Sequence, residues 1–83
     1  MPTVLRKDGF RFYFYSEEGN EPMHIHVAYG SGRAKYWLKP DVFLASNIGF
    51  KAKDIKRAKE LIKENLDLIK EKWNEYDIRR KNP

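Results

Sequence analysis

The sequence contains no cysteine, and only four prolines and five glycines occur among its 83 residues. The lack of cysteine excludes a disulfide framework and a thiolate metal site, so a domain of this size depends on packing for its stability. No apolar run reaches the ~20 residues that cross a bilayer, and no signal peptide is recognisable. We therefore expect one cytoplasmic domain, residues 1–83, without membrane association.

Aromatic residues and cations are abundant by contrast. Five Phe, five Tyr and two Trp make up 14% of the chain and supply large buried areas to a small core. Lys and Arg number 17 against 12 acids, which gives a net charge of +5. Such a charge favours polyanions or an acidic protein partner, although it is equally typical of a solvated surface.

The period of the apolar residues changes once along the chain. Residues 3–38 alternate as strands do, with expected strands at 3–6, 10–15, 24–29 and 33–38, and later residues repeat as a helix does. We predict an α+β fold, in which an antiparallel sheet of about four strands (residues 3–38) is covered on one face by a long C-terminal helix (about 51–77). Residues 41–50 fit either an edge strand or a short helical turn.

The first two expected strands form a hairpin around Asp8-Gly9. This dipeptide is typical of a type I′ turn, which needs positive φ at both central residues. That turn places Leu5 opposite Phe12 and puts the three phenylalanines of the second strand on one face. This face should be the one that the helix covers.

The only two histidines lie on the third expected strand, two residues apart, so both project from one face. A loop around 30–32 leads to the fourth strand. If the apolar residues of both strands stay in the core, His26 pairs with Lys35 and His24 with Trp37. A slip of one residue would bury charges, which makes this register a firm prediction.

The C-terminal helix is expected from a single apolar stripe. Lys51 stands where a capping Ser or Asp is usual, and the sequence leaves open whether the helix bends at Asn65. The helix start is basic, but Glu60 and Glu64 are expected to pair with some of its cations, which favours a solvated helix over a phosphate-binding track. These cations are Lys51, Lys53, Lys56, Arg57, Lys59 and Lys63. The stripe consists of Ile55, Ala58, Ile62, Leu66, Ile69, Trp73 and Tyr76.

The sheet face opposite the helix carries the main functional clue, because it combines cations, aromatic rings and imidazoles. Cations hold phosphates and aromatic rings stack bases, so this face predicts nucleic-acid binding. A solvated face with stabilising aromatic pairs, or a homodimer contact, would give the same pattern. The expected contact residues are Arg11, Tyr13, Tyr15, Arg33, Lys35 and Trp37, together with His24 and His26.

The histidine pair suggests two kinds of chemistry. As a metal-independent ribonuclease, His24 and His26 would serve as general base and general acid, with nearby cations stabilising the phosphorane. Alternatively, both imidazoles could bind one metal ion with Glu21, Glu18 or Glu17 as third ligand, but the chain has no further His or Cys to complete that site. We therefore expect no cofactor, and the sequence leaves open whether the protein is an enzyme.

Several stretches carry a family resemblance: 1–6, 9–12, 14–16, 21–27, 34–38, 49–50 and 73–75. They resemble a family of very small prokaryotic proteins known mainly as a domain of unknown function. Its most specific part is the E-P-x-H-I-H-V stretch, residues 21–27. The resemblance implies two-gene cassettes like toxin–antitoxin pairs and directs attention to Glu21, Pro22, His24, His26, Lys35 and Trp37.

Taken together, these features predict a small cytoplasmic module that contacts RNA or DNA through the sheet face, as one component of a toxin–antitoxin-like pair. The competing interpretation is a non-enzymatic protein that uses this face to dimerise or to hold an acidic partner. A ribonuclease that uses His24 and His26 is the third alternative.

Overall fold

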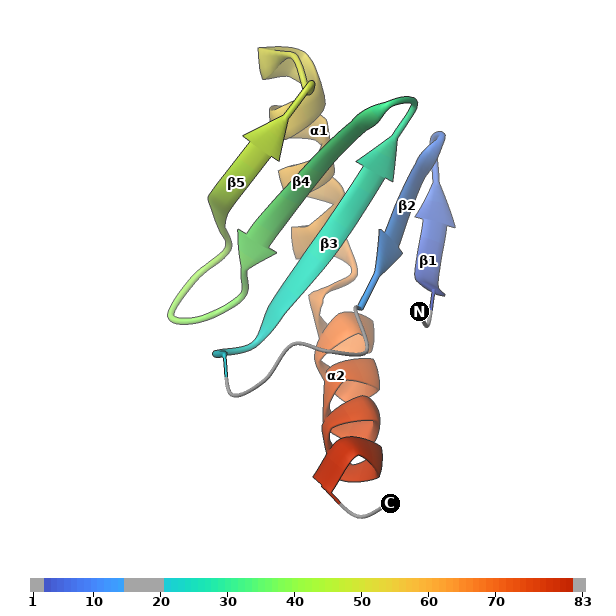
Figure 1. Cartoon of the computed structure of the whole chain (residues 1–83), viewed down its shortest axis with the longest axis vertical. Coiled ribbons are helices and arrows are strands. Elements are labelled where there is room, and N and C mark those ends of the chain that lie inside the picture. The colour runs from blue at the N-terminus through green and yellow to red at the C-terminus, as the bar shows by residue number, and fades with distance from the viewer. Residues whose placement is uncertain (1–2, 15–20, 82–83) are drawn as a thin grey trace.

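A computed structural model describes residues 3–14 and 21–81 of the chain, with side chains described as far as Tyr76. Five antiparallel strands lie in the sheet in chain order, followed by two helices (Figure 1). The α+β class is thus confirmed, whereas the expected four strands and single long helix are corrected to five strands and two helices. The elements are β1 Thr3–Lys7, β2 Phe10–Tyr13, β3 His24–Tyr29, β4 Gly32–Trp37, β5 Phe43–Ile48, α1 Ala52–Glu64 and α2 Leu66–Lys81.

The register of the strands agrees with the sequence patterns. Leu5 lies opposite Phe12, and Asp8 and Gly9 in the turn have φ values of 53° and 84°. A two-residue loop joins β3 to β4 and sets two further pairs as predicted, His26 with Lys35 and His24 with Trp37. The alternation of apolar and polar residues therefore determined how the central strands pair.

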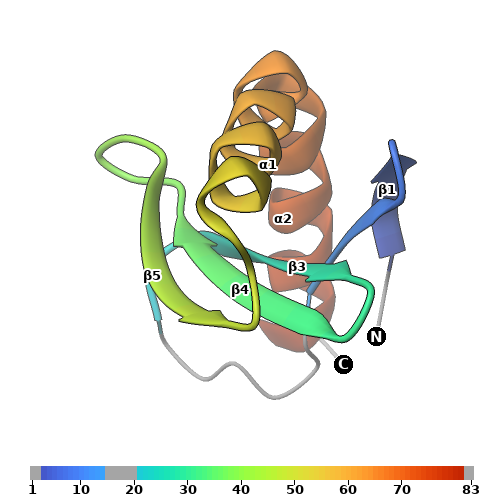
Figure 2. The ribbon, with the colours of Figure 1, turned by 90° about the horizontal axis from the view of Figure 1, so that it is seen from above.

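The core lies between the sheet and α1, which crosses one face of it (Figure 2). Tyr29 lies at the border of the core with 39% of its surface exposed, and its ring stacks on Phe10 at 4.2 Å. Large side chains that are almost completely buried fill the centre: Phe12, Phe14, Ile25, Val27, Tyr36, Leu38, Val42, Leu61, Ile62 and Ile69.

The segment 41–50, which the sequence left open, forms β5 at one edge of the sheet. It pairs with β4 through an irregularity between Lys35 and Tyr36. At its end Asn47 Oδ1 accepts a hydrogen bond from the Phe50 N–H at 2.9 Å, which closes the turn towards α1. This edge strand consequently leads straight into the helix that covers the core.

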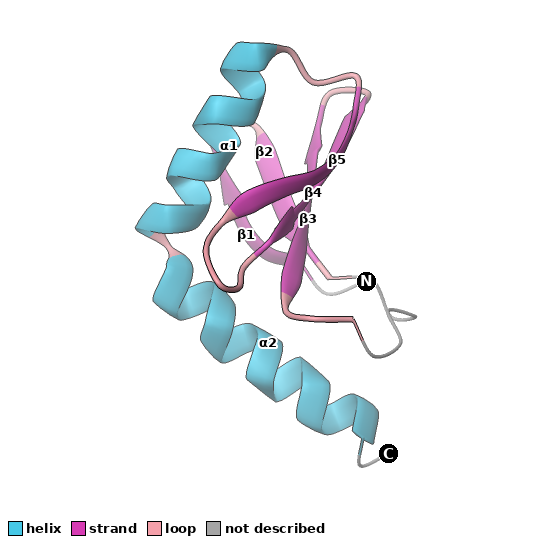
Figure 3. Ribbon diagram, turned by 90° about the vertical axis from the view of Figure 1, so that its left-hand side faces the viewer, coloured by secondary structure: helices cyan, strands magenta, loops and turns pink. Residues whose placement is uncertain are grey.

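The helical region breaks at Asn65. The Asn65 side-chain amide donates to the Leu61 carbonyl at 2.9 Å, so it competes for a backbone acceptor of the last turn of α1. After this single residue α2 continues in a different direction and passes beyond the end of the sheet (Figure 3). Within the described residues, neither helix is both long and apolar enough to span a membrane.

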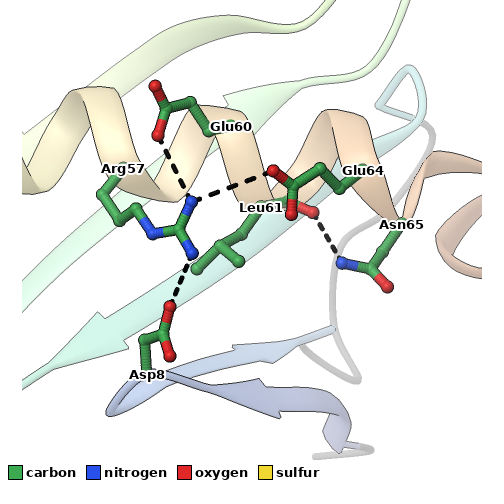
Figure 4. Close-up of polar contacts among 6 residues, drawn as sticks. All are labelled: Asp8, Arg57, Glu60, Leu61, Glu64 and Asn65. Atoms are coloured by element: carbon green, nitrogen blue, oxygen red, sulfur yellow. Dashed lines mark hydrogen bonds and ion pairs between the residues drawn. The ribbon is translucent and has the colours of Figure 1, made fainter.

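The start of α1 has a capping hydrogen bond, although Lys51 is an unusual residue for the N-cap position. The Lys51 N–H donates to Asp54 Oδ2 at 3.1 Å, which is the backward half of a capping box. One turn later, Arg57 donates to Asp8 Oδ2 at 2.6 Å and so links α1 to the β1–β2 turn (Figure 4). That hydrogen bond raises the pKa of Arg57, but the pair is exposed and contributes little net stability.

Tyr36 anchors α1 to the middle of the sheet and gives a prediction for alkaline pH. Its hydroxyl donates to the Ile55 carbonyl at 2.8 Å, and burial raises the pKa of Tyr36 to about 12 from 10.0. Because the folded pKa is the higher one, this stabilisation is complete below pH 10 and disappears as the pH rises through about 12. Two pKa units correspond to roughly 2–3 kcal/mol.

Urea unfolding at pH 9 and pH 12 measures this effect, with Tyr36→Phe as the control because it cannot ionise. We expect the wild type to lose roughly 2–3 kcal/mol more than Tyr36→Phe over this range. Equal losses in the two proteins would show that the ionisation of Tyr36 is not coupled to folding.

Candidate functional site

The sheet face opposite α1 is built from β2, β3 and β4. The pairing of Tyr13 with His26, of His26 with Lys35 and of His24 with Trp37 brings these side chains together on that face, because paired residues share a side of the sheet. We call Tyr13, His24, His26, Lys35 and Trp37 the histidine cluster. Tyr15 was also predicted here and lies outside the described residues.

Stacked rings and cations connect the members of the histidine cluster. The Arg11 guanidinium lies 4.5 Å from the centre of the Tyr13 ring, and Tyr13 stacks on His26 with centroids 5.6 Å apart. The rings of His26 and His24 meet edge to face at 5.2 Å. These side chains bury part of their surface against one another, and aromatic pairs stabilise a sheet through such contacts.

His24 is fully buried, which corrects the prediction that it is displayed on the surface. The ring of Trp73 from α2 lies 5.1 Å from the His24 ring, and the ring of Trp37 lies 5.7 Å from it. The sequence missed this because it did not show where α2 runs after Asn65. Tyr13, also predicted to be exposed, retains only 3% of its surface.

The imidazole of His24 is held in one orientation. Its Nδ1 lies 2.8 Å from the Pro22 carbonyl oxygen, which can only accept, so Nδ1 carries the proton and donates it. Its Nε2 lies 3.8 Å from Glu21 Oε1. A histidine fixed in this way has the geometry of a structural residue that joins a loop to the sheet.

Lys35 and Glu21 form the polar border of the histidine cluster. Lys35 Nζ donates to Glu21 Oε1 at 2.6 Å and lies 4.5 Å from the centre of the Trp37 ring. The Lys35 side chain is 17% exposed and that of Glu21 is 42% exposed. The cation thus covers one face of the indole and is neutralised by a carboxylate, so neither group is open for a nucleotide in this arrangement.

This geometry bears on both hypotheses for the histidine pair, the ribonuclease and the metal site. A ribonuclease needs both imidazoles at the substrate, but His24 has no exposed surface. A metal site at His24, His26 and Glu21 is not formed, since no group of three His, Cys, Asp or Glu suited to a metal ion occurs in residues 3–14 and 21–81. The physical reason is that His24 Nδ1 is turned to Pro22 and Glu21 is held by Lys35.

Arg33 stands apart from the histidine cluster at the far end of β4. Its guanidinium donates to the carbonyl oxygens of Gly30 at 3.0 Å and Gly32 at 2.7 Å, and the residue is exposed. Of the cations predicted on this face, Arg33 is thus the exposed one, while Lys35 and Arg11 lie against aromatic rings.

A second group of cations lies on α1. Glu60 and Glu64 were expected to pair with some of the cations of this helix, and both carboxylates lie beside Arg57, with separations of 3.3 Å and 3.9 Å (Figure 4). Throughout the described part of the chain, no ion pair involves the lysines of α1 or its N-cap. These are Lys51, Lys53, Lys56, Lys59 and Lys63.

Comparison with known proteins gives a family and little else. The family described as Domain of unknown function (DUF4160) matches residues 9–74. This range includes all of β2 to β5, α1 and the part of α2 that contains Trp73. Neither a curated protein nor a solved structure matches the chain.

Proposed function

The chain belongs to the family Domain of unknown function (DUF4160), and we propose that it is a small module that binds RNA or DNA through phosphate contacts. The observation that carries this proposal is the set of α1 lysines without an acidic partner in the described residues. A cation that is not neutralised within the protein keeps its full attraction for phosphate, and its binding releases counterions from the nucleic acid.

The geometry of α1 puts three of these lysines on its solvent side. Lys53, Lys56 and Lys63 are all exposed, whereas Ala58 and Ile62 are fully buried against the sheet. Lys56 and Lys63 are two turns apart, which is about 10 Å along the axis. Long side chains at this spacing can contact phosphates of one nucleic-acid strand. We call Lys53, Lys56 and Lys63 the α1 lysine surface.

The α1 lysine surface supports phosphate binding better than the sheet face does. On the sheet face Lys35 is bound to Glu21, and Arg11 lies against Tyr13 and donates to Thr3 Oγ1 at 3.0 Å. Binding phosphate there would first break these contacts. Arg33 remains exposed, but it donates to the Gly30 and Gly32 carbonyls and lies apart from the other predicted cations, so it supplies less electrostatic attraction than a row of lysines.

Fluorescence anisotropy with a short single-stranded RNA and a DNA of the same sequence tests this function. We expect Kd to rise steeply with salt, and the triple variant Lys53→Gln, Lys56→Gln, Lys63→Gln to reduce the slope of log K against log salt by about 2, at roughly 0.7 for each lost contact. The sheet-face triple Arg11→Gln, Arg33→Gln, Lys35→Gln is the matched control, because it removes equal charge from the opposite face.

The pair of triple variants separates the two surfaces. A reduced slope in the sheet-face triple alone would move phosphate binding to that face and overturn the role of α1. Affinity that does not change with salt, or equal small losses in both variants, would contradict phosphate binding as the function.

We further propose that the module acts as one component of a toxin–antitoxin-like pair. The support is the resemblance carried by the E-P-x-H-I-H-V stretch, residues 21–27. Expression of the protein alone and together with the product of the adjacent gene tests this, with growth rate as the measurement. The ribonuclease alternative is not proposed, because it requires an accessible His24.

A further inference from the structure

Strand β5 is an open edge of the sheet with unusual side chains. All six of its residues are exposed and none is charged. Three are large and apolar: Phe43 is 44% exposed, Leu44 37% and Ile48 74%. An edge strand presents a row of backbone N–H and C=O groups, and an exposed edge without charged side chains is a template for pairing with another strand.

The opposite edge of the same sheet shows the contrast. Strand β1 carries Arg6 and Lys7, both exposed, and charged side chains of this kind are a common means of blocking edge pairing. Figure 1 shows β1 and β5 at the two sides of the sheet. One edge is therefore protected by cations, whereas the other carries no charge over about 20 Å.

One cation is paired with β5 on the outer face of the sheet, and helix geometry assigns a second to the β5 side of α1. On the outer face, Arg33 is paired with Ile48 and is exposed. On the inner face, α1 lies between the β5 side and the β1–β2 side (Figure 2), and Arg57 reaches the β1–β2 turn at Asp8. Lys59 is two residues after Arg57, about 200° around the helix, so it points towards the β5 side.

We propose that β5 accepts an extended segment of a partner protein that combines apolar and acidic residues and pairs with it as a sixth strand. The backbone of the segment would bond the free edge of β5, its apolar side chains would cover Phe43, Leu44 and Ile48, and its carboxylates would meet Arg33 and Lys59. This is recognition by strand addition, in which main-chain bonds supply affinity and side chains supply specificity.

Charge distinguishes this occupant from a second copy of the chain. Two copies that paired through β5 would bring Arg33 and Lys59 of each molecule towards the same seam, and each copy carries a net charge of +5. Like charges in this position disfavour the pair, whereas an acidic segment is attracted. This inference does not depend on nucleic-acid binding, because Lys59 is half-buried and outside the α1 lysine surface.

A synthetic eight-residue peptide of Val-Val-Glu-Glu repeats, blocked at both ends, is the probe. We expect it to bind the full chain and to shift the amide resonances of residues 43–48 more than those of 3–7. Binding should weaken at least tenfold for Ile48→Glu, which removes an apolar contact and adds a repelling charge. The matched control is Leu68→Glu, since Leu68 on α2 is another exposed apolar residue, 37% exposed.

Two peptide controls test the separate parts of the proposal. Replacing each Glu by Lys should abolish binding if charge is decisive, and N-methylation of alternate backbone amides should abolish it if strands pair. Equal binding to Ile48→Glu and Leu68→Glu would overturn the site, and equal binding of the lysine peptide would overturn the acidic partner. A wild-type dimer that Ile48→Glu dissociates in sedimentation velocity would identify a second copy as the occupant.

Discussion

Trp73→Ala should lower the free energy of unfolding by about 3–5 kcal/mol, the range for truncating a large buried aromatic side chain. Trp73 is 6% exposed, and its ring lies 5.3 Å from Phe14 and 5.1 Å from His24. It thus fills the junction between α2 and the end of the sheet. Small domains have total stabilities of about 5–15 kcal/mol, so this loss would leave a large share of the molecules unfolded at 37 °C if the chain is near the lower limit.

Urea denaturation followed by far-UV circular dichroism measures this change, and Leu68→Ala is the control. Leu68 lies on the same helix but is 37% exposed, so its truncation should cost less than about 1 kcal/mol. Similar midpoints for the two variants would mean that α2 is not held against the sheet by Trp73, and the burial of His24 would then need another cause.

His24→Ala should destabilise the fold by about 2–4 kcal/mol, while His26→Ala should cost about 1 kcal/mol. His24 is fully buried, lies near the rings of Trp37 and Trp73 and is hydrogen-bonded to the Pro22 carbonyl, so its removal leaves a cavity and a carbonyl without this donor. His26 is half-buried and mainly stacks on Tyr13. The two histidines, equivalent in the sequence pattern, are therefore expected to differ clearly in thermal and urea unfolding.

His24→Asn provides the sharper comparison. An asparagine amide can donate to the Pro22 carbonyl in place of Nδ1–H, so this variant should recover about 1 kcal/mol relative to His24→Ala. If His24→Ala instead leaves the unfolding curve unchanged, the residue is not structural, and the ribonuclease hypothesis, in which His24 acts on a substrate, becomes the better explanation of the histidine pair.

Because of these contacts, we place the proposed binding functions on surfaces other than the sheet face. A face that appears rich in catalytic and binding groups is largely a set of rings and charges that contact each other, as the bond between Lys35 and Glu21 illustrates. Two other surfaces of the described residues can still bind a partner. One is the set of lysines without an acidic partner on the solvent side of α1, and the other is the exposed strand β5. The proposals for nucleic acid and for a partner strand follow from those two surfaces.

Local patterns in the sequence by themselves determined the hairpin at Asp8-Gly9 and the pairing of His26 with Lys35 and of His24 with Trp37. The physical reason is that turn dihedrals and strand alternation act between residues close in the chain or directly paired. The same patterns allowed 41–50 to be a strand, but its place at the edge depended on β4.

Only the tertiary structure decided which of these residues are buried and which charges are neutralised. His24 is covered by Trp73, 49 residues later in the chain, because α2 turns at Asn65 and passes the end of the sheet. Arg57 bonds Asp8, also 49 residues away in the chain, and forms ion pairs with Glu60 and Glu64. The α1 lysines therefore have no acidic partner in the described residues. Such long-range contacts depend on how elements pack in space, and no local periodicity encodes them.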